Sequence, residues 1–95
     1  MIAIIATLKI VDGKNADFEA AFVQAAAIVR ANEPGCLLYQ LTHSRTEPNI
    51  YKVMELYKDQ TALEAHRDGA HRKTAPSMAG MIDGRPDVEF LDSVG

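Results

Sequence analysis

Residues 36–57, CLLYQLTHSRTEPNIYKVMELY, contain two apolar runs separated by a polar stretch. The runs Cys36–Thr42 and Ile50–Tyr57 include Val, Ile and Tyr, which are common in strands, and the intervening Glu47-Pro48-Asn49 is typical of a loop. The sequence therefore predicts two consecutive strands. Neither set of alternating side chains is cleanly polar in either strand, so we expect both faces of their sheet to be covered.

Two elements are expected before these strands. The run Met1–Val11, MIAIIATLKIV, is apolar at both odd and even positions, which indicates a strand buried on both faces. A turn at residues 12–14 leads into a helix that Asn15 can cap and that ends before Pro34-Gly35, because proline disfavours a helical residue before it. One side of this helix should lie on the sheet, since apolar residues recur there at helical spacing: Phe18, Phe22, Ala25 and Val29.

A short helix is expected directly after the second of the two strands. Either Asp59 or Thr61 can begin it, and Thr61 is followed three residues later by Glu64, a pair that forms a capping box. The helix should run through Arg67 and end at Gly69, because glycine readily adopts the backbone conformation that ends helices.

The rest of the chain predicts one more helical segment and a final strand. The stretch Ala70–Ile82 contains Pro76, which must kink or split a helix. After a turn at residues 84–86, Val88–Val94 is expected to form the last strand. The resulting order, βαββαβ, is typical of the ferredoxin-like α+β fold with an antiparallel sheet.

Composition indicates one globular domain, spanning residues 1–95, with more apolar residues than its own core needs. Of the 95 residues 47% are hydrophobic, although only three Tyr and three Phe are present and there is no Trp. A chain of this length buries only about 60–65% of the surface that it exposes when unfolded. We therefore expect a homodimer in which a second copy covers the open face of the sheet. The net charge of −3 argues against a nucleic-acid binder, which would show a basic excess.

Several classes of cofactor and location leave no signature in the sequence. The single cysteine, Cys36, excludes an internal disulfide and a zinc site built from several cysteines. The six glycines form no G-x-G-x-x-G motif and no phosphate-binding loop, so no motif supports the binding of a nucleotide or a flavin. No basic residue precedes the apolar N-terminal run, and Lys9 interrupts it. We expect a strand there, rather than a signal peptide or a membrane span, in a cytoplasmic protein.

His66 and His71 are the first candidates for chemistry. Histidine is the natural proton-transfer group near neutral pH. Both imidazoles should point toward the sheet, because each shares its side of a predicted helix with apolar residues: Ala62 and Leu63 for the first, and Ala75, Met78 and Ile82 for the second. Each could equally be a partly buried structural histidine, hydrogen-bonded to a backbone carbonyl or a tyrosine hydroxyl.

A metal site is not expected at this pair of histidines. Two histidines five residues apart lie on different sides of a continuous helix, unlike the i, i+4 pair of zinc-binding helices. No Asp or Glu nearby completes a set of ligands on the same face.

Basic residues surround the two histidines: Arg67, Arg72 and Lys73, with Asp68 the only acid among them. Such a run on a short helix is usually a solvated face. The functional alternative is a rim that attracts an anionic substrate, such as a phenolate, a carboxylate or a phosphate.

Three tyrosines and one acid on the predicted strands are further candidates. Tyr39, Tyr51 and Tyr57 can be packing residues with the hydroxyl at an edge, or one of them can donate a hydrogen bond to a substrate oxygen. Glu55 lies inside an otherwise apolar strand, and a buried carboxylate requires a partner. It can pair structurally with Lys, Arg or a backbone group, or act as a second acid or base.

Two sets of motifs span most of the chain. The first is a strand followed by Gly-Lys, a helix containing Phe18, and then Glu33-Pro34-Gly35-Cys36-Leu37-x-Tyr39. The second is Glu55-x-Tyr57-x-Asp59, which leads into Ala62-Leu63-Glu64-Ala65-His66 and then Ala70-His71-x-Lys73. Together they resemble the antibiotic-biosynthesis monooxygenase (ABM) family, which often has an acid, any residue and an aromatic, then Leu-x-x-His, then Pro-His-x-Lys.

The resemblance implies a dimeric α+β barrel with a pocket in each subunit between sheet and helices, and oxygenases that need no metal, flavin or haem. It matches His66 and His71 to the family's two histidines, and Tyr57 to a position where many relatives have Trp. The chain departs from the family where Ala70 replaces a common proline and where Arg72 stands at a usually apolar or aromatic position. The Asn and Trp of haem-degrading relatives have no match, which argues against haem cleavage.

These observations predict a cofactor-independent monooxygenase that acts on a phenolic or quinol-like small molecule with O2. Such a substrate supplies its own electrons once it is deprotonated, so the protein needs a base, a dry pocket and hydrogen-bond donors. We assign His66 as the base and His71 as a second proton-transfer or orienting group. The expected substrate-binding residues are Tyr39, Glu55, Tyr57 and Arg72.

Two other functions stay open at this point. The first is isomerisation of a small phosphorylated dicarbonyl compound, in which the same base moves a proton between carbons and the basic residues hold the anion. The second is a ligand-binding dimeric module without catalysis, which this fold also serves.

Overall fold

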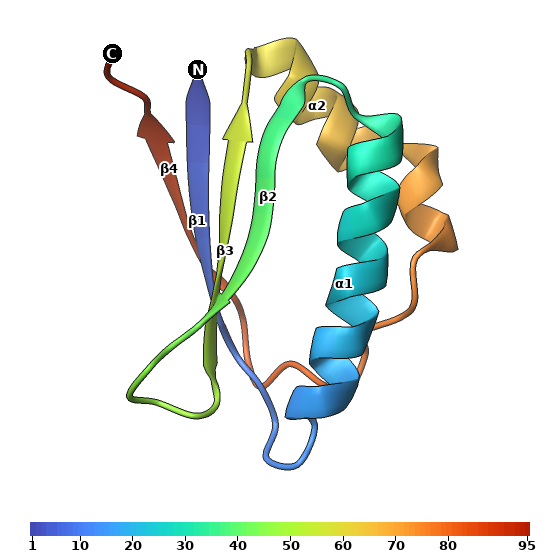
Figure 1. Cartoon of the computed structure of the whole chain (residues 1–95), viewed down its shortest axis with the longest axis vertical. Helices are drawn as coiled ribbons and strands as arrows, with labels where there is room; N and C mark the ends of the chain where they lie inside the picture. Colours follow the sequence, from blue (N-terminus) through green and yellow to red (C-terminus); the bar gives the residue numbers. More distant parts are fainter.

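The computed structural model describes the backbone of residues 1–95 and every side chain except that of residue 72. In chain order the elements are β1 (Ile2–Lys9), α1 (Asn15–Asn32), β2 (Cys36–His43), β3 (Ile50–Tyr57), α2 (Gln60–Asp68), the 3-10 helix η1 (Ala70–Thr74) and β4 (Asp87–Asp92). Both α-helices lie on one side of the four-stranded sheet (Figure 1). The βαββαβ order and the antiparallel sheet confirm the predicted ferredoxin-like α+β fold. None of the described helices is both long and apolar enough to cross a membrane.

The sheet has the strand order β2-β3-β1-β4, and all neighbouring strands are antiparallel. In the central strand β1, Ile5 lies opposite Met54 of β3 and opposite Glu89 of β4. Successive side chains of a strand point to opposite faces of the sheet. The buried Ile4 and Leu8 therefore lie on the helix side of β1, and Ile5 lies on the outer face.

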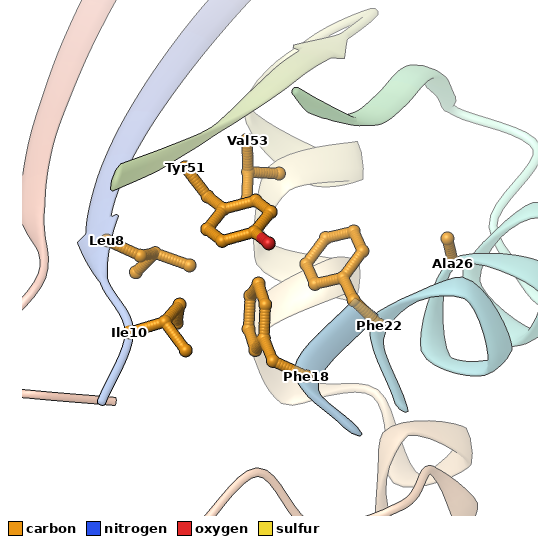
Figure 2. Packing of buried hydrophobic residues seen from close by; sticks show 7 residues of the cluster. All are labelled: Leu8, Ile10, Phe18, Phe22, Ala26, Tyr51 and Val53. Carbon is orange, nitrogen blue, oxygen red and sulfur yellow. The ribbon is translucent and has the colours of Figure 1, made fainter. Parts of the chain in front are cut away.

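The main apolar core lies between α1 and the half of the sheet nearest the β2–β3 loop (Figure 2). The ring centroids of Phe18 and Tyr51 are 5.1 Å apart in an edge-to-face arrangement, and those of Phe18 and Phe22 are 6.0 Å apart. Burying one such side chain stabilises a fold by about 1.5–3 kcal/mol. Phe18, Phe22 and Val29 are buried as their spacing predicts, whereas Ala25 is only half buried because it borders a cavity.

The start of α1 differs from the prediction, and the start of α2 agrees with one of the two alternatives. The N-cap position of α1 is Lys14, which makes no side-chain capping hydrogen bond. The predicted cap by Asn15 is wrong, because its side-chain amide donates instead to the carbonyl of Pro48 at 2.7 Å and to the Tyr51 hydroxyl at 3.1 Å. At α2 the cap is Asp59, whose carboxylate accepts from the backbone N–H of Ala62 at 2.8 Å.

Of the predicted helical stretch 70–82 only Ala70–Thr74 is helical, and it ends before Pro76, the residue expected to kink or split it. Pro76 lacks a backbone N–H and disfavours a helical residue before it, so a continuous helix cannot form. The chain from Met78 to Ile82 still packs against the core, and Ile82 forms an isolated bridge with Ile10. The last strand is Asp87–Asp92, which begins and ends earlier than predicted.

Within one chain the sheet stays open on its outer face and along β4. All six residues of β4 are exposed, including Phe90 at 64% and Val88 at 46%. In Figure 1 this strand stands at the sheet edge farthest from α1. The outer face has a hollow of about 530 Å³, to which Met54 and residues of all four strands contribute. The covering expected from the sequence is therefore not supplied by this chain itself.

Gly35 allows α2 to approach the turn between α1 and β2. A Cβ atom at residue 35 would lie only 2.6 Å from the Cβ of Ala62, in the first turn of α2. The backbone N–H of Lys58 donates to the carbonyl of Gly35 at 2.9 Å and holds the turn in place. The position of α2, and with it that of His66, depends on the absence of a side chain at this point.

Replacing Gly35 with alanine should lower the free energy of unfolding by about 1–3 kcal/mol, the usual cost of overpacking. Ala62→Gly should relieve the clash, although alone it costs up to about 1 kcal/mol in helix propensity. The double variant should therefore be more stable than the sum of the two single effects predicts. Urea unfolding of the four proteins measures this coupling. Strictly additive free energies would show that Ala62 does not limit residue 35.

Candidate functional site

The buried carboxylate of Glu33 lies at the centre of a polar cluster. Glu33 follows the last residue of α1, its backbone N–H donates to the carbonyl of Val29, and its side chain is only 3% exposed. Pro34 then prevents the helix from continuing. A buried ionised carboxylate is costly unless it is hydrogen-bonded. Two histidines from later in the chain, His66 and His71, are its partners.

His66 lies in the last turn of α2 and faces the interior, as predicted, with 8% of the residue exposed. Its Nδ1 lies 2.8 Å from Oε1 of Glu33. Its ring centroid is 5.2 Å from that of Tyr39 and 5.4 Å from that of Tyr57. A carboxylate therefore holds this imidazole, where the sequence suggested a backbone carbonyl or a tyrosine hydroxyl.

His71 reaches the same carboxylate from η1. Its Nε2 lies 2.5 Å from Oε2 of Glu33, and its side chain is 20% exposed. The ring lies directly against Gly69, because a Cβ atom there would be 2.3 Å from Cε1 of His71. Only a residue without a side chain fits at position 69.

The two histidines lie on separate helical segments, so the different sides expected on a continuous helix do not apply to them. The helix ends at Asp68, and the break at Gly69 turns His71 back toward His66. The acid that joins the two histidines is Glu33, which is too far away in the sequence to be recognised from their neighbours: it is 33 residues from His66 and 38 residues from His71. In the part of the chain that the structure describes, no group of three or more His, Cys, Asp or Glu side chains is arranged to hold a metal ion.

Tyr57 and Glu55 form a second polar pair beside the histidines. Tyr57 is fully buried, and its hydroxyl donates to Oε1 of Glu55 at 2.5 Å. Burial, and then the neighbouring carboxylate of Glu55, raise the pKa of Tyr57 well above its ordinary value of 10.0. The hydroxyl therefore stays protonated, and its proton is directed at Glu55.

Tyr39 connects the histidines to an apolar cavity. Its ring stacks on Phe22 with a centroid distance of 5.4 Å and an interplanar angle of 13°, and it also contacts His66. In the sheet, Tyr39 lies opposite Glu55 of β3. Arg30 of α1 donates to the backbone carbonyl of Tyr39 at 2.8 Å, which fixes this strand against the helix.

The cavity has a volume of about 480 Å³ and opens between α1 and the segment from Arg67 to Met78. Such a volume is in the usual range of sites for small molecules. Its walls are mainly apolar: Phe22, Ala25, Ile28 and Val29 on one side, and Ala75, Pro76 and Met78 on the other. Neither histidine lines it directly, but Tyr39 and Gly69 do, and each of these contacts a histidine.

Charged residues lie at the edge of the cavity, as the basic run in the sequence suggested. Arg67, Asp68 and Lys73 line it, and Nε of Arg67 is 3.5 Å from Oδ1 of Asp68. Both of these side chains are more than half exposed, so their pairing contributes little to stability. The predicted substrate contact Arg72 lies outside the described side chains.

The structure thus brings together five predicted site residues: His66, His71, Tyr39, Glu55 and Tyr57. It also places Glu33, which was not among the predicted site residues, at the centre of this cluster. A carboxylate bound to an imidazole orients the ring and stabilises the imidazolium that forms when the ring takes a proton. The cluster can therefore act as a base next to an apolar cavity. The spacing of residues in the sequence does not identify Glu33 as a site residue, because an acid at a helix end is normally exposed. The only sequence feature that pointed to it is its place in the motif Glu33-Pro34-Gly35-Cys36.

Cys36, at the start of β2, adjoins this cluster but is not a nucleophile. Its Sγ donates weakly to the carbonyl of Leu38 at 3.4 Å. Burial, and then the carboxylate of Glu33, raise the pKa of the thiol from 9.0 to about 11. Since the thiolate is the reactive form, the thiol should be inert near neutral pH.

Alkylation by iodoacetamide should therefore be slow in the folded protein. At pH 8 the folded thiol has about 100-fold less thiolate than a thiol whose pKa is 9.0, because the pKa difference is about two units. The rate should rise with pH until about pH 11. Protein unfolded in urea is the control. Equal rates for the folded and unfolded protein at pH 8 would contradict the burial of this thiol.

Comparison with known proteins places the chain in one family. The family model described as antibiotic biosynthesis monooxygenase matches residues 1–76. A structure from Caulobacter crescentus CB15, provisionally named an antibiotic biosynthesis monooxygenase, is 47% identical, covers 99% of this chain and 90% of its own, and has a TM-score of 0.91. A search of curated proteins gave no significant match.

More distant structures share the fold. A protein from Nitrosomonas europaea with the same provisional name is 21% identical, covers 100% of both chains and has a TM-score of 0.84. A protein from Pseudomonas aeruginosa is 23% identical, covers 99% of this chain and 94% of its own, and has a TM-score of 0.83. With four-fifths of the chain matched by the family model and nearly all of it by the Caulobacter structure, the chain belongs to the antibiotic biosynthesis monooxygenase family.

Proposed function

We propose that this protein is a cofactor-independent monooxygenase that transfers one atom of O2 to a phenolic or quinol-like small molecule. The observation that chiefly supports this proposal is the imidazole of His66, buried next to an apolar cavity and hydrogen-bonded to a carboxylate, in a chain of this family. A base of this kind and a cavity that excludes water are the two things that the reaction requires of a protein.

The chemistry starts with the removal of a proton from the hydroxyarene. The resulting anion is readily oxidised, and one of its carbons forms a bond to O2 and becomes a hydroperoxide. The protonated base returns its proton to the peroxide, and loss of water from the carbon that bears both a hydrogen and the hydroperoxide then converts this ring C–H position to a carbonyl. One oxygen atom remains in the product and the other leaves as water, so the substrate supplies all four electrons that reduce O2.

In this scheme His66 takes the proton, and the substrate ring lies in the cavity against Tyr39. His71 orients the site through the carboxylate that it shares with His66. Of the two predicted tyrosine donors we favour Tyr39, because its side chain lines the cavity. Glu55 and Arg72 remain predicted substrate contacts.

A second candidate is isomerisation of a small phosphorylated dicarbonyl compound. The observation that favours it is the presence of Arg67 and Lys73 at the edge of the cavity, where they could hold a phosphate. The same base would move a proton between two carbons. Deuterium uptake into such a substrate without consumption of O2 would identify this reaction, and uptake of O2 with a dihydroxyarene would identify the first.

Replacing His66 with asparagine tests the assignment of the base. Asparagine keeps an N–H group that can donate to Glu33 but has no basic nitrogen. Turnover of an accepted dihydroxyarene, measured as O2 uptake, should fall by roughly 10²- to 10⁴-fold. His43→Asn is the matched control, because His43 is an exposed histidine at the β2–β3 loop, where its Nε2 lies 2.8 Å from the carbonyl of Pro48.

The thermal midpoint of unfolding separates a catalytic role from a structural one. A catalytic His66 leaves this midpoint almost unchanged in His66→Asn while turnover falls. A lower midpoint with unchanged turnover per folded molecule would mean that His66 only stabilises the fold. Full activity in a stable variant would remove His66 from the mechanism.

We also propose that the protein works as a homodimer in which a second copy covers the open parts of the sheet. Large apolar side chains are exposed on both faces: Val88 and Phe90 on the helix side of β4, and Leu38 and Met54 on the outer face. An edge strand exposed in this way is prone to associate with another chain. A copy related by two-fold symmetry would cover the same surface on both chains.

Sedimentation equilibrium should show a dimer at micromolar concentration. The dimer interface should bury roughly 1,200–2,000 Å² of surface in total. Phe90→Lys should weaken association at least about 100-fold, because a two-fold interface loses the buried ring twice. Val23→Lys, at a position of α1 that is 63% exposed, is the control and should not change the dissociation constant. A wild-type protein that is monomeric at micromolar concentration would contradict the proposal.

A further inference from the structure

Each oxygen of the Glu33 carboxylate serves one of the two histidines. Oε1 lies 2.8 Å from Nδ1 of His66, Oε2 lies 2.5 Å from Nε2 of His71, and the Glu33 side chain is 3% exposed. We infer that Glu33 is a positioning residue that gives the two histidines opposite tautomers, with the ring proton on Nδ1 of His66 and on Nε2 of His71. In this arrangement we take His66 as the base, and His71 holds η1 against the end of α1. The inference rests on the proposed function where it names a base.

The tautomers follow from the chemistry of the carboxylate. An ionised carboxylate has no proton to donate, so each ring nitrogen that faces it must carry one. A neutral imidazole has a single ring proton, and its other nitrogen has the lone pair that can accept a proton. The lone pair of His66 is therefore on Nε2, whereas that of His71 is on Nδ1.

The surroundings of the two rings decide which of them can meet a substrate. Nδ1 of His71 lies against Gly69, since a Cβ atom at residue 69 would be 2.8 Å from this nitrogen and 2.3 Å from the adjacent Cε1. Gly69 therefore covers one side of the His71 ring. His66 instead contacts Tyr39, whose side chain lines the cavity. Neither ring lines the cavity, but the ring of His66 contacts an aromatic side chain of its wall, and on this contact we take His66 as the base.

His71 then has a structural role, in which it also contacts Glu33. It ties η1 to the end of α1, and the residues that follow η1, Ala75, Pro76 and Met78, form a wall of the cavity. The hydroxyl of Thr74 donates to the carbonyl of His71 at 2.7 Å and closes the last turn of η1. One buried carboxylate therefore sets both the protonation of the base and the position of the cavity wall.

Glutamine cannot replace Glu33 in this role, although it has the same shape. Its amide has one oxygen that accepts and one nitrogen that donates. In either orientation one of the two rings meets a donor, and that ring must move its proton to the other nitrogen or lose the contact. Aspartate keeps two accepting oxygens but is shorter by one methylene group.

The tautomers can be measured without any substrate. Long-range ¹H–¹⁵N correlation spectra of the ¹⁵N-labelled protein, recorded at alkaline pH where the rings are neutral, distinguish protonated from unprotonated ring nitrogens. Spectra of His66→Asn and His71→Asn assign the signals, and His43 is the internal reference. We expect a proton on Nδ1 of His66 and on Nε2 of His71. The same tautomer at both rings, or rapid exchange between tautomers at either one, would overturn the inference.

Variants of Glu33 connect the spectra to turnover. Glu33→Gln should change the tautomer of one ring, and when that ring is His66 it should lower O2 uptake on the order of 10²- to 10⁴-fold, as expected when the base is held in the wrong state. It should add little to the loss in His66→Asn, because both changes affect the same base. Glu33→Asp should recover part of the activity. Glu64→Gln, at an exposed position of α2, is the control and should leave both measurements unchanged.

The two readouts separate this inference from the proposed function. Opposite tautomers in a protein that consumes no O2 with any dihydroxyarene would support the role of Glu33 and count against the monooxygenase. Normal O2 uptake by Glu33→Gln with a changed tautomer at His66 would overturn the inference and leave the monooxygenase intact. If Glu33→Gln does not fold, the wild-type spectrum alone decides whether the two rings are set in opposite states.

Discussion

A carboxylate that is removed from water must be hydrogen-bonded, and the arrangement of three elements depends on how Glu33 meets this requirement. Glu33 stands where α1 ends, and its two oxygens contact the last turn of α2 and the start of η1. The end of α1 is 33 and 38 residues from the two histidines, and the shared carboxylate gives the three segments a common polar contact. Gly35 and Gly69 make the same arrangement possible by leaving space for Ala62 and for the ring of His71.

The helix side of the sheet is divided between an apolar half and a polar half. Near the β2–β3 loop, Phe18, Phe22 and Tyr51 form a dense aromatic core that stabilises the domain. At the other end the interior contains Glu33, His66 and the pair Tyr57–Glu55, all of which need hydrogen-bond partners. Stability thus comes mainly from one half, which leaves the other free to hold ionisable groups next to a cavity.

Much of the fold could be predicted from the sequence because the deciding features are local. Alternation and apolar runs indicate strands, the spacing of Phe18 and Phe22 indicates the buried side of α1, and Asp59 begins α2 by capping a neighbouring N–H. The errors also have local causes. Pro76 stops the helix that apolar spacing suggested, and the amide of Asn15 is drawn away from the helix to Pro48 and Tyr51, which no local rule could foresee.

The sequence by itself determined the order of elements, the family motifs and the inward direction of His66, since each of these depends on residues a few positions apart. Only the tertiary structure decided that one buried acid joins both histidines, that the Tyr57 hydroxyl is directed at Glu55, and that Tyr39 links the cluster to a cavity. The physical reason is the distance along the chain. Glu33 meets His66 across 33 residues and His71 across 38, and such contacts depend on how α1, α2 and the break at Gly69 are placed in space.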